Sequence, residues 1–161
     1  MAKFTVLKKL LTDDACDRLI SLLPEEPIEK RTHSISEISP IGEWLKGPIT
    51  QRRCKLAVDD SIINSIRSQH RTLRSLEYYA PLMYVTKYVA GDICVEHYDP
   101  SDYTVIILLN NDFTGGNLYV ENFDTELSAG DAVVFEGKMM HKVSEVTNGS
   151  RYALSIWFRK K

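Results

Sequence analysis

The sequence has few cysteines, no long apolar run and no large excess of either charge. Its three cysteines, Cys16, Cys54 and Cys94, are far apart and follow no zinc-binding or disulfide spacing. No apolar stretch reaches the roughly 18 residues that a membrane helix needs. The opening residues also lack the apolar core and small-residue cleavage site of a secretory signal. We therefore expect a protein of the reducing cytoplasm that does not span a membrane.

The composition predicts one folded domain over residues 1–161. Hydrophobic residues make up 43% of the chain and charged residues 26%, which favours a compact core over disorder. The formal net charge is only −2, but ten acidic residues and no Lys or Arg fall between residues 92 and 136. Such a segment is usually a solvated face, and it also repels polyanions. We therefore do not expect a nucleic-acid partner.

The N-terminal half, about residues 1–80, indicates two helices. Thr12 is placed to cap a helix over residues 13–23, which Pro24 ends. The four prolines between Pro24 and Pro48 predict a loop with one short strand at most. Asp60 is placed to cap a second helix, from Ser61 to about residue 76. Its core-facing residues would be Ile62, Ile63, Ile66, Leu73 and Leu76.

The second half, about residues 81–159, is typical of short β-strands. Six segments rich in β-branched and aromatic residues alternate with glycine-containing turns, at 82–89, 103–109, 117–120, 132–135, 141–146 and 152–158. Residues 103–109 (YTVIILL) are apolar on both faces and predict a fully covered central strand. The expected fold class is mainly β, a sandwich or barrel, with the N-terminal helices packed on the outer face of one sheet.

The short motif His97-Tyr98-Asp99 contains two possible metal ligands. In an extended segment His97 and Asp99 point to the same face, with Tyr98 pointing away. Alone, this motif is more often a surface ion pair. His141 is the best third ligand, because it opens an apolar strand, whereas His33 and His70 lie in polar surroundings. Two histidines and one carboxylate on one cavity wall form the facial triad that suits non-haem Fe(II).

A buried arginine would complete the site. Arg151 lies in an apolar strand, where a guanidinium is costly unless it meets an anion such as a carboxylate. Together with a metal, it would hold a dicarboxylate cosubstrate at both ends. Tyr88 could add a hydroxyl donor, although an ordinary core tyrosine is an equally good interpretation.

The length of the loop before Arg151 decides which side of the sheet its side chain faces. Arg151 and His141 must face the same side of the sheet, and a two-residue hairpin loop at Asn148-Gly149 would put them on opposite sides. We therefore predict a three-residue loop, Thr147–Gly149, with Gly149 at positive φ. Cavity-facing positions would then be Arg151, Ala153, Ser155 and Trp157, and outward-facing positions Tyr152, Leu154, Ile156 and Phe158.

The order of the motifs resembles the 2-oxoglutarate- and Fe(II)-dependent dioxygenase superfamily, in its prolyl 4-hydroxylase-like branch. The resemblance runs from about residue 83 to 158 and rests on KYVAGDICVEHYD, TVIILLN, FTGGNLYV, SAGDAVVFEGKMMHKVSEV and NGSRYALSIWF. It implies a double-stranded β-helix, or jelly roll. It implies Fe(II) bound by His97, Asp99 and His141, and 2-oxoglutarate bound by Arg151 and Tyr88. It also allows for ascorbate as a further cofactor.

The resemblance implies hydroxylation of a C–H bond with release of succinate and CO2, most simply on a peptidyl proline. Some relatives carry a second tyrosine where this chain has Leu108, which leaves the cosubstrate one polar contact fewer. A lid is expected from residues 29–50, including Trp44. The alternatives are a free amino acid or small metabolite as substrate, or a non-catalytic jelly-roll binding module. The nucleic-acid dealkylase branch of the superfamily typically has an Asn between two arginines after the distal histidine. It fits less well here, because no Asn lies between Arg151 and Arg159.

Overall fold

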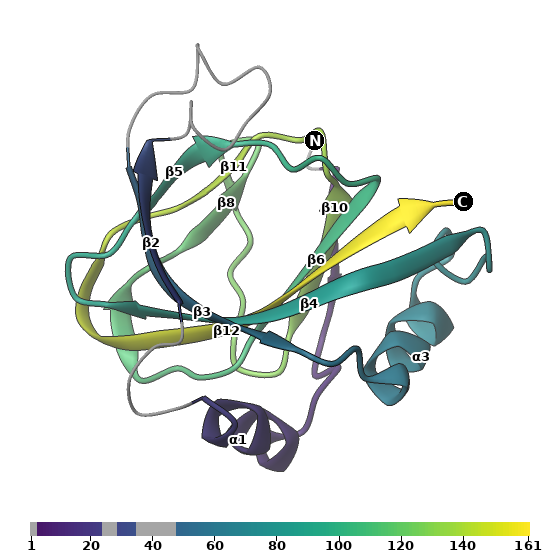
Figure 1. Ribbon diagram of the computed structural model, residues 1–161, viewed down its shortest axis with the longest axis horizontal. Coiled ribbons are helices and arrows are strands. Elements are labelled where there is room, and N and C mark those ends of the chain that lie inside the picture. Colours follow the sequence, from purple (N-terminus) through teal and green to yellow (C-terminus); the bar gives the residue numbers. More distant parts are fainter. Residues whose placement is uncertain (1–2, 24–28, 35–47) are drawn as a thin grey trace.

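The structure is a computed structural model that describes residues 3–23, 29–34 and 48–161, and its regular elements are mostly β-strands (Figure 1). The two helices are α1 (Asp13–Ser21) and α3 (Asp60–Gln69). The strands are β1 (Thr5–Leu7), β2 (Glu29–Ser34), β3 (Pro48–Leu56), β4 (Tyr78–Val89), β5 (Cys94–His97), β6 (Tyr103–Leu108), β7 (Phe113–Gly115), β8 (Leu118–Val120), β9 (Phe123–Asp124), β10 (Ala132–Glu136), β11 (His141–Val143) and β12 (Val146–Lys160).

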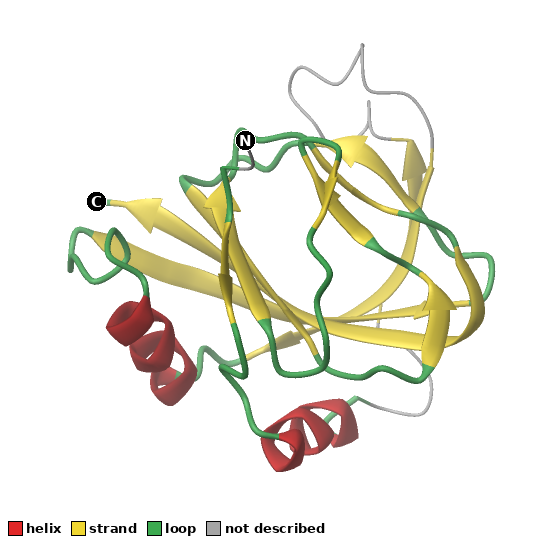
Figure 2. Cartoon of the chain, turned by 180° about the vertical axis from the view of Figure 1, so that it is seen from behind, coloured by secondary structure: helices red, strands yellow, loops and turns green. Residues whose placement is uncertain are grey.

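The strands form one antiparallel sheet that folds over into two facing layers (Figures 1 and 2). The first layer has the order β1-β10-β6-β12-β4-β3, and the second has the order β5-β11-β8-β9. The layers join where Ile49 of β3 pairs with Cys94 of β5. β2 extends from β3, and β7 pairs with the start of β12. This is the predicted jelly roll, and a strand lies in each of the six predicted segments, although the one predicted over 141–146 ends at Val143 and Val146 begins β12.

Apolar side chains fill two separate spaces, one on each side of the first layer. The outer cluster joins both helices to the first layer, so the prediction of helices on one sheet face is confirmed (Figure 2). Its members include Cys16, Leu19, Ile62, Ile63, Ile66, Val105, Ile107, Leu154, Ile156 and Phe158. The inner cluster lies between the layers and includes Tyr88, Cys94, Ile106, Leu118, Val120, Val133, Phe135, Val143, Val146 and Ala153. β6 contributes to both clusters, which makes it the predicted central strand.

The helix starts are set by side-chain caps. Thr12 accepts a hydrogen bond from the backbone N–H of Ala15 at 3.1 Å, as predicted, although α1 ends at Ser21 rather than at residue 23. The predicted cap of α3 is wrong by one residue. Asp59, not Asp60, accepts from the backbone N–H of Ser61 at 2.9 Å. Each cap satisfies an N–H that the helix itself leaves without a partner.

The second helix is shorter than predicted. It ends at Gln69 because His70 takes extended backbone angles. The Arg67 guanidinium donates to the carbonyls of Leu73, Ser75 and Tyr78, which stabilises the turn that follows. Leu73 is fully buried within this turn, as predicted, but Leu76 is 75% exposed, so its placement in the core is wrong.

The predicted hairpin before Arg151 is also wrong. β11 pairs with β5 and β8, whereas residues 146–149 already belong to β12 and pair with β7. Gly149 does take positive φ, at 76°, where any side chain would collide with the Asp112 carbonyl. The predicted facing of the later residues nevertheless holds. Arg151 and Ala153 are buried on the inner side, while Leu154, Ile156 and Phe158 pack in the outer cluster.

The segment predicted as a proline-rich loop contains two paired strands. β2 and β3 form an antiparallel pair, from Glu29 opposite Arg53 to Ser34 opposite Pro48. The middle of the predicted lid, including Trp44, lies outside the described residues. That residues 29–50 cover the site therefore stays a prediction.

The three cysteines are free thiols, and each is buried. Within the part of the chain that the structure describes, neither helix has the length and apolarity needed to cross a bilayer.

Candidate active site

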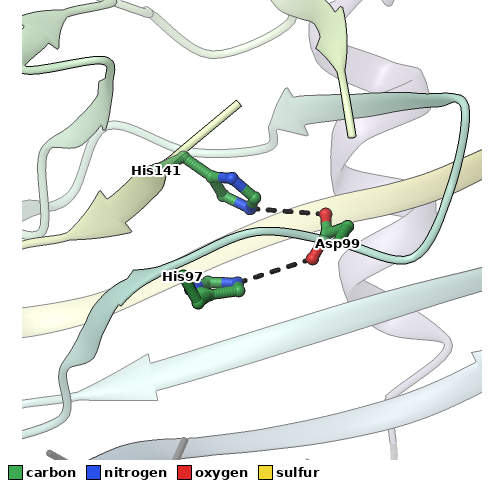
Figure 3. A group of neighbouring side chains, drawn as sticks. All are labelled: His97, Asp99 and His141. Atoms are coloured by element: carbon green, nitrogen blue, oxygen red, sulfur yellow. Dashed lines mark ion pairs between the residues drawn. The ribbon is translucent and has the colours of Figure 1, made fainter. Parts of the chain in front are cut away.

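His97, Asp99 and His141 come together at one end of the space between the two layers (Figure 3). His97 ends β5 and pairs directly with His141, which begins β11. Asp99 follows β5 by two residues, and its carboxylate faces both rings from one side (Figure 3). Its Oδ1 is 3.5 Å from Nε2 of His97, and its Oδ2 is 3.3 Å from Nε2 of His141. One ligand atom from each residue lies within 4.8 Å of the others, close enough to share one ion.

The other ring nitrogen of each histidine is held by the backbone. Nδ1 of His97 lies 2.8 Å from the carbonyl of Val95, and Nδ1 of His141 lies 2.9 Å from the carbonyl of Met139. A carbonyl can only accept, so Nδ1 carries the proton in both rings. This leaves the lone pair of Nε2 facing the shared space, as in histidines that bind metals.

Asp99 is held in place by three hydrogen bonds, one to a nearby residue and two to distant parts of the chain. Its Oδ2 accepts from the Thr104 hydroxyl at 2.7 Å and from the Trp157 indole N–H at 3.1 Å. Its own backbone N–H donates to the Gly137 carbonyl at 2.8 Å. The carboxylate therefore has little freedom to rotate away from the two histidines.

The charges of these residues favour a bound cation. Burial alone would lower the pKa of His97, but Cys94 and Asp99 outweigh that effect and raise the pKa well above its usual value, so a metal ion at Nε2 would take the place of a proton. Burial would likewise raise the pKa of Asp99, yet His141 and His97 hold it well below its usual range. The carboxylate is thus ionised in a largely buried position, where a metal ion would compensate its charge.

Arg151 and Tyr88 lie deeper between the layers. They face each other across β12 and β4, and the guanidinium carbon lies 5.3 Å from the centre of the Tyr88 ring. Arg151 is 2% exposed, and its Nε has no hydrogen-bond partner among the residues that the structure describes. Burial lowers the pKa of this guanidinium, an effect that an anion would reverse. Burial raises the pKa of Tyr88 well above its usual value, so the hydroxyl remains a donor.

The sequence analysis did not predict that three further residues contact the metal cluster. Thr104, Gly137 and Cys94 all contact the cluster, the last with Sγ 3.5 Å from Nδ1 of His97. Trp157 was predicted to face the cavity, but its hydrogen bond to Asp99 was not. Only one signal was available in the sequence: a threonine that interrupts the apolar run of residues 103–109 indicates a buried polar contact.

Comparisons with known proteins point to one family. Residues 83–159 match the model of the 2OG-Fe(II) oxygenase superfamily. A PKHD-type hydroxylase from Delftia acidovorans is 40% identical over 58 residues, which are 34% of this chain and 26% of that protein. Human prolyl 3-hydroxylase 1 is 36% identical over 78 residues, 41% of this chain and 11% of that protein. The match therefore spans only 26% of the first relative and 11% of the second.

One solved structure covers almost the whole chain. It is the viral collagen prolyl hydroxylase of Paramecium Bursaria Chlorella virus-1 in complex with 2OG. The TM-score is 0.69 with 16% sequence identity, over 99% of this chain and 97% of that one. At this identity the likeness shows a shared fold. The family match rests on residues 83–159, just under half of the chain.

The oxygenase family uses Fe(II) and 2-oxoglutarate, and the residues present fit both groups. Two imidazoles and one carboxylate that converge on a single space are the donor set of non-haem Fe(II) sites. Arg151 is buried, and no described residue pairs with its Nε, so it has the chemistry to bind the distal carboxylate of 2-oxoglutarate.

Proposed function

We propose that the chain is an Fe(II)- and 2-oxoglutarate-dependent dioxygenase that hydroxylates a peptidyl proline. The observation that carries the proposal is the convergence of His97, Asp99 and His141 at one end of a space that also contains the buried Arg151. Removing any of these charged or polar groups from water is costly, and a metal and an anion would together offset that cost. We further propose that residues 1–161 act as one domain, since both helices share a core with the first layer.

Each residue would have a defined role. His97, Asp99 and His141 would hold Fe(II), and the hydrogen bonds from Thr104 and Trp157 would orient the Asp99 carboxylate. Arg151 would hold the distal carboxylate of 2-oxoglutarate, and the Tyr88 hydroxyl would donate to this cosubstrate. With both groups bound, the chemistry supplied is the transfer of one oxygen atom of O2 to a C–H bond, coupled to conversion of 2-oxoglutarate to succinate and CO2.

Aromatic side chains beside the metal cluster support a proline-containing substrate. Trp157 reaches Asp99 through its indole N–H, and the Tyr84 ring packs against the Trp157 ring edge-on, with centres 5.7 Å apart. The Arg53 guanidinium lies over the Tyr84 ring, 4.2 Å from its centre. Aromatic surfaces suit the compact, apolar pyrrolidine ring, as they do in other proline-binding grooves. Two of the proteins compared above are named as prolyl hydroxylases.

The test is hydroxylation of defined peptides by the purified chain. The protein is incubated with Fe(II), 2-oxoglutarate and proline-rich peptides, and succinate and the mass of each peptide are measured. The proposal expects succinate and a peptide heavier by one oxygen atom, both abolished by His141→Ala and unchanged by His70→Ala. His70 lies at the end of α3 and is not part of the metal cluster.

The same experiment separates the alternatives. Succinate without peptide modification, together with oxidation of a free amino acid or small metabolite when one is added, would indicate that class of substrate. A chain that binds neither Fe(II) nor 2-oxoglutarate would be a jelly-roll binding module, and the enzymatic proposal would be wrong.

A further inference from the structure

The face of the first layer beside the metal cluster is basic as well as aromatic. Arg53 and Lys55 lie two residues apart on β3, so their side chains leave the sheet on the same face. Lys55 pairs with Tyr84 of β4, and Tyr84 pairs with Ser155 of β12, two residues before Trp157. Directly paired residues share a face of the sheet, so both cations lie on the inner face with Tyr84 and Trp157. We call Arg53 and Lys55 the basic surface.

Ring contacts join Arg53 to the metal cluster. Its guanidinium carbon lies 4.2 Å from the centre of the Tyr84 ring. The Tyr84 ring packs against the Trp157 ring at 5.7 Å, and the Trp157 indole N–H reaches Asp99 at 3.1 Å. These contacts place the guanidinium about 16 Å or less from the Asp99 carboxylate, a length that an extended peptide covers in about five residues.

The Arg53 guanidinium is suited to bind a carboxylate from this position. Its contact with the Tyr84 ring uses none of its five N–H donors, and a bidentate carboxylate takes only two of them. Arg53 and Tyr84 are each half-buried, so salt screens a charge pair here less than on an open surface. Lys55 is exposed and adds a second positive charge, which attracts an anion from solvent.

Several acidic residues of the segment 92–136 are paired with other cations. Asp92 pairs with Arg52 at 2.8 Å, and Asp131 pairs with Lys8 at 3.3 Å. These carboxylates therefore are not the counterions of the basic surface. A substrate with a negative charge would meet a complementary charge beside the metal cluster.

We propose that the substrate peptide carries a carboxylate within about five residues of the target proline, and that Arg53 binds this carboxylate. The inference rests on the proposed function and names the peptides that the same site accepts. An acidic side chain and the C-terminal carboxylate of a peptide have the same chemistry, so either group can fill this role. Arg53 thus determines specificity, while the reacting C–H bond lies at the metal cluster.

The test is the selection that the Fe(II)-loaded protein makes within a peptide library. Each peptide has one central proline, mixed residues at the five positions on either side and an amidated C-terminus. Hydroxylated products are sequenced by mass spectrometry. We expect Asp and Glu to be enriched over Asn and Gln about tenfold or more at one position, as for a hydrogen bond between charged groups. A second library, with a free C-terminus within five residues of the proline, shows whether the terminal carboxylate serves instead.

Reversing the charge of Arg53 separates recognition from a structural role. Arg53→Glu should lose the enrichment of acidic residues and select Lys and Arg at the same position. A loss of folding alone would lower the yield of every peptide and reverse no preference. Lys87→Glu is the matched control, because Lys87 pairs with the outward-facing Tyr152 on the opposite face of the first layer. It should keep the wild-type preference.

The outcomes separate this inference from the proposed function. If no peptide is hydroxylated although Fe(II) and 2-oxoglutarate bind, the proposed peptidyl-proline substrate is wrong, and the inference is wrong with it. If peptides are hydroxylated with no preference for acidic residues or for a free C-terminus, only the inference is overturned. The same holds if Arg53→Glu retains the preference of the wild type.

Discussion

The indole N–H of Trp157 donates to Oδ2 of Asp99 at 3.1 Å, which joins the last strand of the fold to the carboxylate of the metal cluster. The Thr104 hydroxyl donates to the same oxygen at 2.7 Å. Two donors on one oxygen restrict the rotation of the carboxylate and orient its other oxygen for a metal. The cluster thus depends on β6 and β12 as well as on the strands that bear its histidines.

Removing either donor should weaken metal binding without unfolding the protein. Trp157→Phe keeps an aromatic ring and Thr104→Val keeps the shape, so each loses mainly the hydrogen bond. We expect each variant to bind Mn(II) about 10- to 100-fold more weakly, as measured by equilibrium dialysis. Tyr84→Phe, which keeps its ring against Trp157, is the control. Wild-type affinity in both variants would show that these bonds do not orient Asp99.

A glycine next to the cluster should be equally sensitive. The Gly137 carbonyl accepts from the backbone N–H of Asp99, and a Cβ at Gly137 would collide with the carbonyl of Ser101. Gly137→Ala should therefore displace the loop that carries Asp99 and lower Mn(II) affinity. Lys138→Ala, at the neighbouring exposed residue, should leave it unchanged. Equal affinities in the two variants would contradict the proposed close packing.

Asp131 should make stability depend on pH. Burial would raise its pKa, but the backbone N–H groups of Lys9 and Ser128 and the Lys8 ammonium outweigh burial and lower it. A lowered pKa stabilises the folded state above the unfolded-state pKa of about 3.9, and this stability is lost as the pH falls through the folded-state pKa.

Asp131→Asn should therefore unfold more easily than wild type at pH 7, by about 1–3 kcal/mol in urea titrations. The difference should shrink below about pH 4, where the wild-type carboxyl also becomes neutral. Asp17→Asn, an exposed position on α1, serves as the control. A difference that stays constant from pH 7 to pH 3 would be inconsistent with this ionisation.

The docking of α3 should stabilise the fold without taking part in the site. Ile66 is fully buried between α3 and the first layer, so Ile66→Ala should cost about 2–5 kcal/mol in the free energy of unfolding. Leu76→Ala, at an exposed residue, should change it by no more than about 0.5 kcal/mol. Metal affinity should be unchanged in both folded variants. Loss of metal binding in Ile66→Ala would place α3 in the site after all.

The sequence predicted those features of the structure that depend on residues close together in the chain. The apolar run of β6 and the i, i+2 spacing of His97 and Asp99 were both readable from the chain. β2 and β3 were missed because their charged sequences show no alternation, and their strand form depends on pairing with each other and with β4. In the same way, Asn148-Gly149 favours a turn locally, but pairing with β7 makes it part of a strand.

Some contacts around the metal cluster could not be predicted, because they join residues far apart in the sequence. Trp157 and Asp99 are separated by 58 positions, and no local pattern relates them. The end of α3 is a similar case. Its apolar spacing continues to Leu76, but the Arg67 guanidinium binds the carbonyls of Leu73, Ser75 and Tyr78 in a non-helical turn.

The most direct test is to locate iron in crystals grown without oxygen in the presence of Fe(II) and 2-oxoglutarate. An anomalous difference map at the iron edge should show one peak bonded to Nε2 of His97, a carboxylate oxygen of Asp99 and Nε2 of His141. The distal carboxylate of 2-oxoglutarate should pair with Arg151. Iron bound elsewhere, or a map with no peak between these three residues, would contradict the account.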